Sequence, residues 1–271
     1  MFFRGLAGSP LDGFRPSSAQ HSLCRGDCAW SEQNIPQHST IFMRALGACA
    51  LLRIDVRCCR PVMQFNGFRS RLCHTMKSLS CDPAHIKGMS ERLIISHYEN
   101  NYGGAVKRLN LIDEQLAQLE FDKAAGFLIN GLKREQLIAM NSMILHELFF
   151  DGLGDQSEPR GPLREAIIRD FESFERWRAE FVAMGKALSG GSGWVLLSWS
   201  PRDRKLVNQW AADHCHTLAG GTPILALDMY EHSYHMDFGA KAAGYVDCFM
   251  EVIRWQNAER QFKALSDGGS R

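Results

Sequence analysis

An aspartate and a histidine four positions apart, Asp228 and His232, carry the clearest chemical signal in this sequence. Asp228 directly follows residues 223–227, a short apolar run that is typical of a buried strand. A carboxylate at the end of a buried strand needs a partner, because an unpaired buried charge is very costly. A metal ion can supply that partner, and His232 could reach the same ion. The spacing alone is a weak signal, since many proteins contain it by coincidence.

Two further histidines, His97 and His146, each lie on the apolar face of a predicted helix. A single histidine on such a face is usually a core side chain with a satisfied hydrogen bond, and that interpretation stays open for each of them. Two helices that each present one histidine inward, together with Asp228 and His232, make a stronger case for a common site. Three neutral imidazoles and one carboxylate suit iron or manganese and leave a fifth position for solvent. We therefore predict that these four residues bind one Fe or Mn ion.

The elements that position these side chains follow from the spacing of apolar residues. Apolar residues recur at three- and four-residue steps over 90–121, which predicts a helix that carries His97. Gly103 and Gly104 interrupt this helix, at a cost that a kink or a close backbone approach could justify. Residues 133–150 predict a second helix. Two long helices with a short connection favour an antiparallel hairpin.

The second half of the chain has a different pattern. A linker rich in turn-forming residues covers 155–162. The predicted elements after it are a helix over 162–188, strands over 194–199, 205–212 and 223–227, and a final helix over 240–264. Helices that flank a small antiparallel sheet indicate an α+β domain. We predict an α+β protein with a long helical hairpin domain over 76–158 and an α/β domain with a three-stranded antiparallel sheet over 159–271.

The composition of the chain limits the class of protein. Of its 271 residues, 45% are hydrophobic and 23% are charged, as in an ordinary soluble globular protein. The formal net charge is +1, so the sequence implies neither nucleic acid nor an acidic membrane surface as a partner. No apolar run reaches the length of a transmembrane helix, so we expect no membrane association.

Residues 1–75 differ from the rest of the chain. They hold nine Arg, no Lys, four acidic residues and six of the nine Cys, whereas residues 76–271 hold 22 basic and 26 acidic residues. Three interpretations stay open: a disordered extension or a start chosen upstream of Met76, an Arg-rich transit peptide, or a small cysteine-bound metal or disulfide module. The later cysteines show no pairing pattern, which favours a reducing compartment. We expect a cytoplasmic protein, or a mitochondrial one if 1–75 are a transit peptide.

Five motifs, in order and with compatible spacing, resemble those of the iron/manganese superoxide dismutases. The resemblance covers about residues 78–265, and all four candidate ligands hold the residue types of the family. Asp228-Met-Tyr-Glu-His232 is similar to the family's most characteristic motif, usually D-V-W-E-H. The other motifs are 95–98 followed by 109–110, 141–146, 165–174, and 191–194, with Trp255 in the last helix. The resemblance implies a superoxide dismutase with one Fe or Mn ion per subunit, superoxide as substrate, and a homodimer.

The residue that binds the solvent molecule on the metal departs from the family pattern. The family commonly uses a glutamine, which iron-type members place at the position of Ser142 and manganese-type members at that of His214. We hypothesise that His214 takes this role, since an imidazole can donate through one nitrogen and accept at the other. His216 is a rival two residues away, and an exposed loop histidine without any role is the simpler alternative.

The substrate gateway departs from the family as well. Asn101 and Ala105 stand where the family has a histidine and a tyrosine, and His235 stands where it has a second tyrosine. An Asn101–His235 pair could replace the family's contact across the dimer interface. Glu231 keeps the position from which the family bridges to the partner's ligand histidine. The residues that we expect around the ligands or at the dimer interface are Trp194, Tyr230, Glu231, His235 and Asn101.

Two other functions compete with dismutation of superoxide. The altered gateway would suit a non-dismutase redox metalloenzyme on the same scaffold. A catalytically silent structural protein is the other alternative. The intact ligand set argues against it, because packing alone does not require three histidines and an aspartate to converge on one point.

Overall fold

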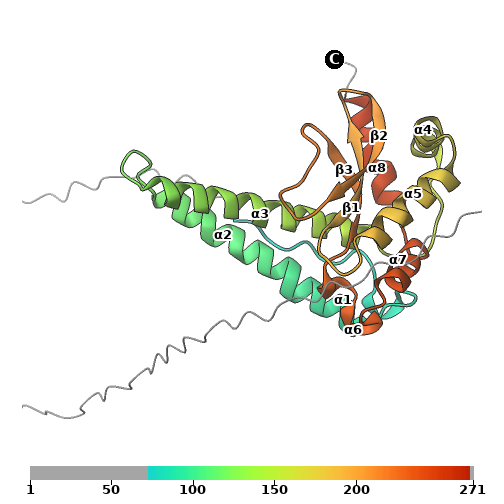
Figure 1. The fold of residues 1–271 in the computed structure, drawn as a ribbon, viewed down its shortest axis with the longest axis horizontal. Helices are drawn as coiled ribbons and strands as arrows, with labels where there is room; N and C mark the ends of the chain where they lie inside the picture. The colour runs from blue at the N-terminus through green and yellow to red at the C-terminus, as the bar shows by residue number, and fades with distance from the viewer. Residues whose placement is uncertain (1–72, 269–271) are drawn as a thin grey trace, which may run out of the picture. The chain divides into compact units, whose positions relative to one another are not determined.

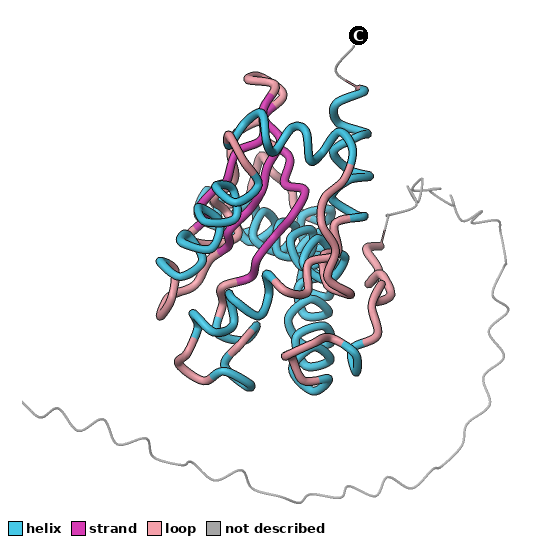
Figure 2. The backbone as a smooth tube through the Cα atoms, turned by 90° about the vertical axis from the view of Figure 1, so that its right-hand side faces the viewer, coloured by secondary structure: helices cyan, strands magenta, loops and turns pink. Residues whose placement is uncertain are grey.

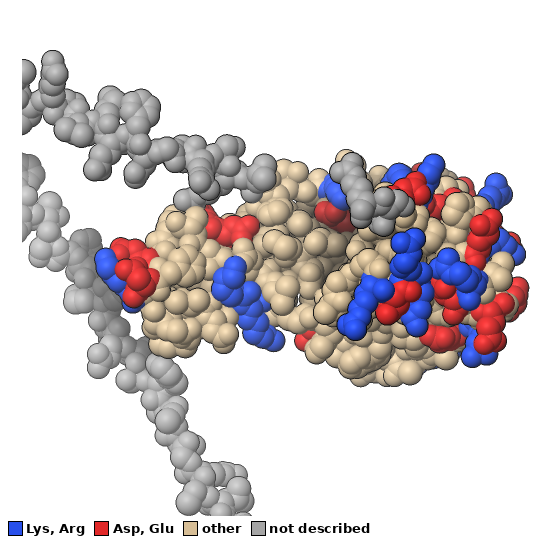
Figure 3. Space-filling view, turned by 90° about the horizontal axis from the view of Figure 1, so that it is seen from above, with Lys and Arg blue, Asp and Glu red and all other residues tan. Residues whose placement is uncertain are grey.

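A computed structural model of the chain describes residues 73–268 (Figure 1). The predicted extension over 1–75 therefore lies outside the described residues except for its last three, and its three interpretations stay predictions. Within 73–268, no helix combines the length and the apolar character needed to cross a membrane. Basic and acidic side chains lie beside one another on the face drawn in Figure 3.

The predicted antiparallel hairpin is confirmed, and its two long helices lie side by side in Figure 1. The second helix begins earlier than the predicted residue 133. The periodicity missed its first turns because they project beyond the core, where Phe127 and Leu128 are exposed. After a short 3₁₀ turn, η1 (Pro83–His85), the hairpin consists of α1 (Glu91–Ser96), the π-helical segment η2 (His97–Tyr102), α2 (Gly103–Gln118) and α3 (Gly126–Asp151).

The first hairpin helix changes from α-helical to π-helical hydrogen bonding at the predicted ligand His97. His97 opens the π-helical segment, and Gly103 begins regular α-helix again. A Cβ atom at Gly103 would lie 3.0 Å from Sδ of Met76, so the glycine leaves room for that side chain. The close neighbour is a side chain, and the predicted close backbone approach is not observed at Gly103 or Gly104. Single π-helical turns inside α-helices occur frequently at functional sites.

The second half of the structure contains the predicted three-stranded antiparallel sheet, so the α+β fold class is confirmed. Its strands are β1 (Trp194–Ser200), β2 (Lys205–Ala211) and β3 (Thr222–Asp228), each within one residue of the predicted ends. The strand order is β2-β1-β3, and every residue of the central strand is buried. Helix α3 packs against β3, and helices that follow it in the chain pack against all three strands (Figures 1 and 2).

The single helix predicted over 162–188 is wrong, because the chain forms two helices there. They are α4 (Gly161–Phe171) and α5 (Phe174–Ala187). The helix breaks at Glu172, whose φ of 71° lies in the left-handed region. Ser173 then caps the new helix, since its side chain accepts a hydrogen bond from the backbone N–H of Arg176.

The single final helix predicted over 240–264 is wrong as well. Residues 251–255 leave the helix because they pair with the chain after α3. The backbone N–H of Arg254 donates to the carbonyl of Gly152 at 2.9 Å, and Leu153 bridges Ile253 in antiparallel fashion. The last part of the chain therefore contains η3 (Glu231–Ser233), α6 (His235–Phe238), α7 (Ala242–Met250) and α8 (Gln256–Asp267).

The sheet register brings Trp194 and the predicted ligand Asp228 to the same end of the sheet. Trp194 on the central strand lies opposite Ala211 on one side and opposite Asp228 on the other. Gly193 precedes this row with a φ of 141°. A Cβ atom there would lie 2.3 Å from the carbonyl oxygen of Ala211, so only glycine fits between the strands. The loop that follows Ala211 starts at the same end.

Candidate metal centre

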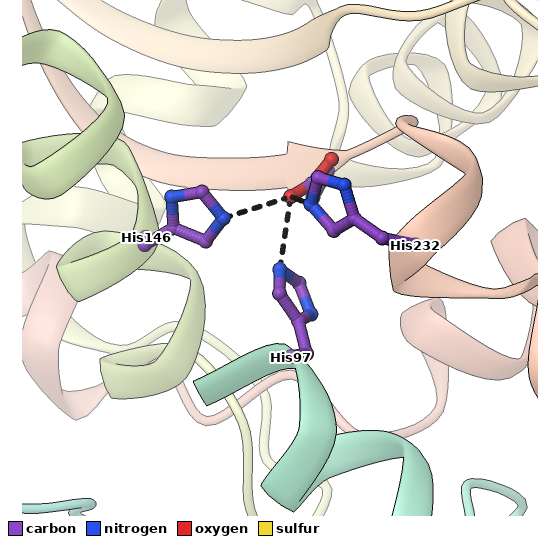
Figure 4. Close-up of side chains that lie close together, drawn as sticks. His97, His146 and His232 are labelled. Carbon is purple, nitrogen blue, oxygen red and sulfur yellow. Dashed lines mark hydrogen bonds and ion pairs between the residues drawn. The ribbon is translucent and has the colours of Figure 1, made fainter. Parts of the chain in front are cut away.

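The four predicted ligands lie together although they come from four separate elements (Figure 4). His97 opens the π-helical segment, and His146 projects from α3. Asp228 is the last residue of β3, and His232 lies in the short helical turn η3 just after it. One donor atom from each residue lies within 4.8 Å of all the others.

One oxygen of Asp228 lies at the centre of this cluster. Its Oδ2 atom is 3.1 Å from Nε2 of His97, 3.2 Å from Nε2 of His232 and 3.6 Å from Nε2 of His146. Such separations between donors are compatible with one ion bound at about 2.0–2.2 Å from each donor. Nε2 of His146 is buried and has no hydrogen-bond partner among the described residues. A metal ion would satisfy this nitrogen, so the residues present fit iron or manganese.

Hydrogen bonds outside the cluster orient the ligands. Nδ1–H of His146 donates to the backbone carbonyl of Ser142 at 2.7 Å, which leaves the lone pair on Nε2 facing the cluster. The other carboxylate oxygen of Asp228, Oδ1, accepts from the backbone N–H of Tyr230 at 2.8 Å. Each of these two ligands therefore has one atom held by the backbone and one atom directed inward.

Burial sets the protonation states that a metal requires. Desolvation lowers the pKa of His146 to about 3 and also lowers the pKa of His97, so both rings are neutral at pH 7. Burial alone would raise the pKa of Asp228. Hydrogen bonds from His232 and His97, together with the positive charge that these rings carry when protonated, outweigh burial and hold that pKa below its ordinary value. Asp228 is thus a carboxylate beside the two neutral imidazoles of His97 and His146, the form that binds a cation.

Aromatic side chains enclose the two ligands from the hairpin. The ring centroids of Phe149 and Phe150 each lie 5.0 Å from that of His97. Trp194 meets His146 edge-on at 5.3 Å. These rings exclude water from the hairpin side of the cluster and lower the dielectric around it.

Comparison with known proteins agrees with this geometry. Residues 159–261 match a family model described as iron/manganese superoxide dismutases, C-terminal domain. The iron superoxide dismutase of Cupriavidus metallidurans is 67% identical over 193 residues, which span 71% of this chain and 98% of that protein. The chain belongs to the iron/manganese superoxide dismutase family.

More distant relatives include both manganese and iron superoxide dismutases. The manganese superoxide dismutase 1 of Halobacterium salinarum is 34% identical over 66% of this chain and 89% of its own length. The iron superoxide dismutase of Aquifex pyrophilus is 30% identical over 68% of this chain and 92% of its own length. The resemblance predicted from the motifs is therefore confirmed at the level of the family.

The structure separates the two histidines that compete for the solvent-binding role in this family member. The ring of His214 lies 6.2 Å from the ring of His146, and its Nδ1 accepts a hydrogen bond of 3.0 Å from Nε1 of Trp194. His216 instead points away, with a side chain 55% exposed and paired with Asp213 at 3.0 Å. His214 is thus the histidine that lies beside the cluster.

Tyr230 connects His214 to the ligands by stacking. Its ring lies 4.8 Å from that of His214, with an angle of 10° between the planes, and 5.4 Å from that of His232. Burial and the negative charge of Asp228 raise the pKa of Tyr230 to about 12, so its phenol stays protonated at neutral pH. Tyr230 therefore adds no charge to the site.

The remaining predicted residues lie further out. Asn101 is half-buried in the π-helical segment, and Ala105 is buried in α2. Glu231 and His235 are exposed. The contact of Asn101 with His235 is predicted between two subunits, and it stays a prediction.

The site contains two contacts that the sequence analysis does not predict. Ser142 is expected only as the counterpart of a glutamine, yet its backbone carbonyl orients His146. The helical spacing of four residues could have indicated this contact. Asn141 donates from Nδ2 to the carbonyl of His214 at 2.6 Å and so joins α3 to the loop after β2. No local pattern indicates that second contact.

Proposed function

We propose that this protein is a superoxide dismutase, which converts superoxide to dioxygen and hydrogen peroxide at one iron or manganese ion. The observation that carries the proposal is the convergence of Nε2 of His97, His146 and His232 on Oδ2 of Asp228. The names of the relatives support the same reaction. A bound iron or manganese ion supplies the one-electron chemistry, because it can alternate between trivalent and divalent states.

The residues of this chain provide the environment for that chemistry. Three imidazoles and one carboxylate would hold the ion, and one proton taken up with each electron would keep the net charge of the buried site constant. We assign His214 to the hydrogen bond with the solvent molecule on the metal, in the role of the family's glutamine. Trp194 and Tyr230 hold the His214 ring beside the cluster.

Separate loading with each metal tests the proposal. The protein is prepared with iron alone and with manganese alone, and superoxide consumption is measured at equal metal occupancy. Iron is the first metal to test, because the relative at 67% identity is named an iron enzyme. We expect superoxide to be consumed catalytically in at least one form, with the metal-free protein as the control. No activity in either fully loaded form would refute the proposed reaction.

We further propose that the active protein is a homodimer. Glu231 is exposed directly beside His232, whose side chain is 26% exposed, so a second subunit could reach this edge of the site. Substitution Glu231→Ala should shift the protein toward monomer in analytical ultracentrifugation, while Glu172→Ala, at an exposed residue far along the chain, should not. A wild-type protein that is monomeric and fully active at micromolar concentration would contradict the dimer.

A further inference from the structure

A cavity of about 340 Å³ lies outside the metal cluster, where α3 and α8 both pack against β3. Its size is that of a site for a small molecule. Its walls include Ile144 and Leu148 of α3, Pro223 of β3, and Asn257 and Arg260 of α8. None of the four predicted metal ligands lines this cavity, so it is separate from the metal site.

Asn257, the second residue of α8, carries a hydrogen-bond donor without an acceptor. The residue is only 4% exposed, and its Oδ1 accepts from the guanidinium of Arg260 at 2.5 Å. A guanidinium can only donate, so this contact determines which end of the amide is the oxygen. The other end, Nδ2, is buried and has no hydrogen-bond partner among the described residues. A buried N–H without an acceptor is costly, so it indicates a missing partner.

The groups around this amide favour a negatively charged partner. Arg260 makes no ion pair within residues 73–268, and its one hydrogen bond there goes to Asn257, so the rest of its guanidinium is free to donate. Helix α8 begins at Gln256, so the positive end of its dipole lies at the same corner of the cavity. Glu259, the acidic residue of that first turn, is engaged elsewhere, because it accepts from the backbone N–H of Arg160 at 2.7 Å.

The acidic residues of the lining leave this positive corner intact. Glu147 forms an ion pair with Lys77 and accepts from the hydroxyl of Tyr102 at 3.1 Å, so both of its oxygens are occupied. Asp151, the last residue of α3, belongs to the other helix. Unsatisfied donors therefore gather on the α8 wall, and the apolar side chains come from α3 and β3.

We propose that this cavity binds a small organic carboxylate. Its oxygens accept from Nδ2 of Asn257 and from the guanidinium of Arg260, which together need several lone pairs and a negative charge. The apolar side chains of Ile144, Leu148 and Pro223 offer a surface for a short carbon chain. The site goes beyond the proposed dismutase function, because neither the metal ion nor superoxide takes part in it.

Isothermal titration calorimetry on the metal-loaded full chain tests the site with three probes. Hexanoate carries both a carboxylate and a carbon chain, hexan-1-ol carries the chain alone, and sulfate carries negative charge alone. We expect hexanoate to bind at one saturable site per subunit. Hexan-1-ol should not bind, and sulfate should bind at least about tenfold more weakly than hexanoate, because it buries no apolar surface.

Two substitutions locate the bound hexanoate. Asn257→Asp keeps the shape of the side chain and its contact with Arg260, but it replaces the free N–H by a carboxylate oxygen, so binding should be lost. Arg260→Gln, at an exposed residue, should weaken hexanoate binding at least about tenfold, because a charge-assisted hydrogen bond is lost. The matched control is Lys263→Gln, which removes one positive charge from an exposed position of α8 outside the lining and should leave the affinity unchanged.

Three results would overturn the proposal. Wild-type protein without saturable hexanoate binding would show that the cavity takes no such ligand. Equal affinity in wild type and in Arg260→Gln would show that hexanoate binds elsewhere. Sulfate that binds as tightly as hexanoate, with the same loss in the variants, would show an anion site without preference for carboxylates. If urea titration shows that Asn257→Asp is unfolded, Arg260→Gln decides alone, since that side chain is exposed.

Discussion

The helical hairpin and the sheet hold their parts of the metal site in different ways. His97 and His146, from the hairpin, are almost completely buried among aromatic rings, and a single backbone hydrogen bond, to the carbonyl of Ser142, orients His146. Asp228, with His214 beyond it, belongs to the sheet and its loops and is fixed by directed hydrogen bonds. Apolar packing fixes the position of a ligand but has little effect on its charge distribution, whereas a hydrogen bond changes the charge distribution of the group that it contacts. We therefore expect changes in the hairpin to affect metal retention and protein stability, and changes at the sheet to alter the redox properties of the bound metal.

The strongest way to break this comparison is to remove a hairpin ligand. We expect His146→Ala to reduce metal affinity more than the about 10–100-fold that loss of an outer partner costs, so that purified protein contains almost no metal. Elemental analysis after loading measures this directly. His216→Ala is the control, because His216 is an exposed histidine outside the cluster. Metal retained at full occupancy in His146→Ala would contradict the ligand assignment.

Packing on the hairpin side is tested by Phe149→Ala. Phe149 is fully buried and lies 5.0 Å from the His97 ring, so its loss leaves a cavity next to a ligand. We expect the free energy of unfolding to fall by about 3–5 kcal/mol, measured by urea titration. Phe127→Ala on the same helix is the control, because Phe127 is 83% exposed. Equal losses in the two variants would show that the hairpin does not hold His97 by packing.

The sheet side is tested at the turn before β1. Gly193→Ala would place a Cβ atom 2.3 Å from the carbonyl oxygen of Ala211, at a φ of 141°. We expect a loss of about 1–3 kcal/mol of unfolding free energy, because the strands must separate next to Trp194. Gly191→Ala, whose Cβ would lie 3.6 Å from its nearest neighbour, should have little effect. A Gly193→Ala protein as stable as the control would argue against this register.

The smallest expected effect concerns the contact that joins the two halves. Asn141→Ala removes the hydrogen bond from the hairpin to the carbonyl of His214 and should cost about 1 kcal/mol. Asn130→Ala, at an exposed position of α3, is the control. An equal loss of unfolding free energy in the two variants would contradict a stabilising contribution from this hydrogen bond.

The sequence by itself determined the residue types of the site and the class of the fold. Apolar spacing predicted the hairpin and the three strands, and Asp228 at the end of a buried strand indicated a cation. These features are local, because burial patterns repeat with the period of each element. Helix ends were less well predicted: the break at Glu172 depends on one left-handed residue, and the break near Arg254 depends on pairing with a segment about one hundred residues away.

Only the tertiary structure decided which histidine stands beside the ligands and what it can do there. His214 stands at the glutamine position of the family, and His216 is its rival two residues away in the same loop. The sheet register places Trp194 next to Asp228, and the indole then selects His214 and occupies its Nδ1. The direction of a hydrogen bond depends on which donor the fold brings to a nitrogen. The sequence shows which side chains can donate or accept hydrogen bonds, but the packing of strands and helices determines which of them pair.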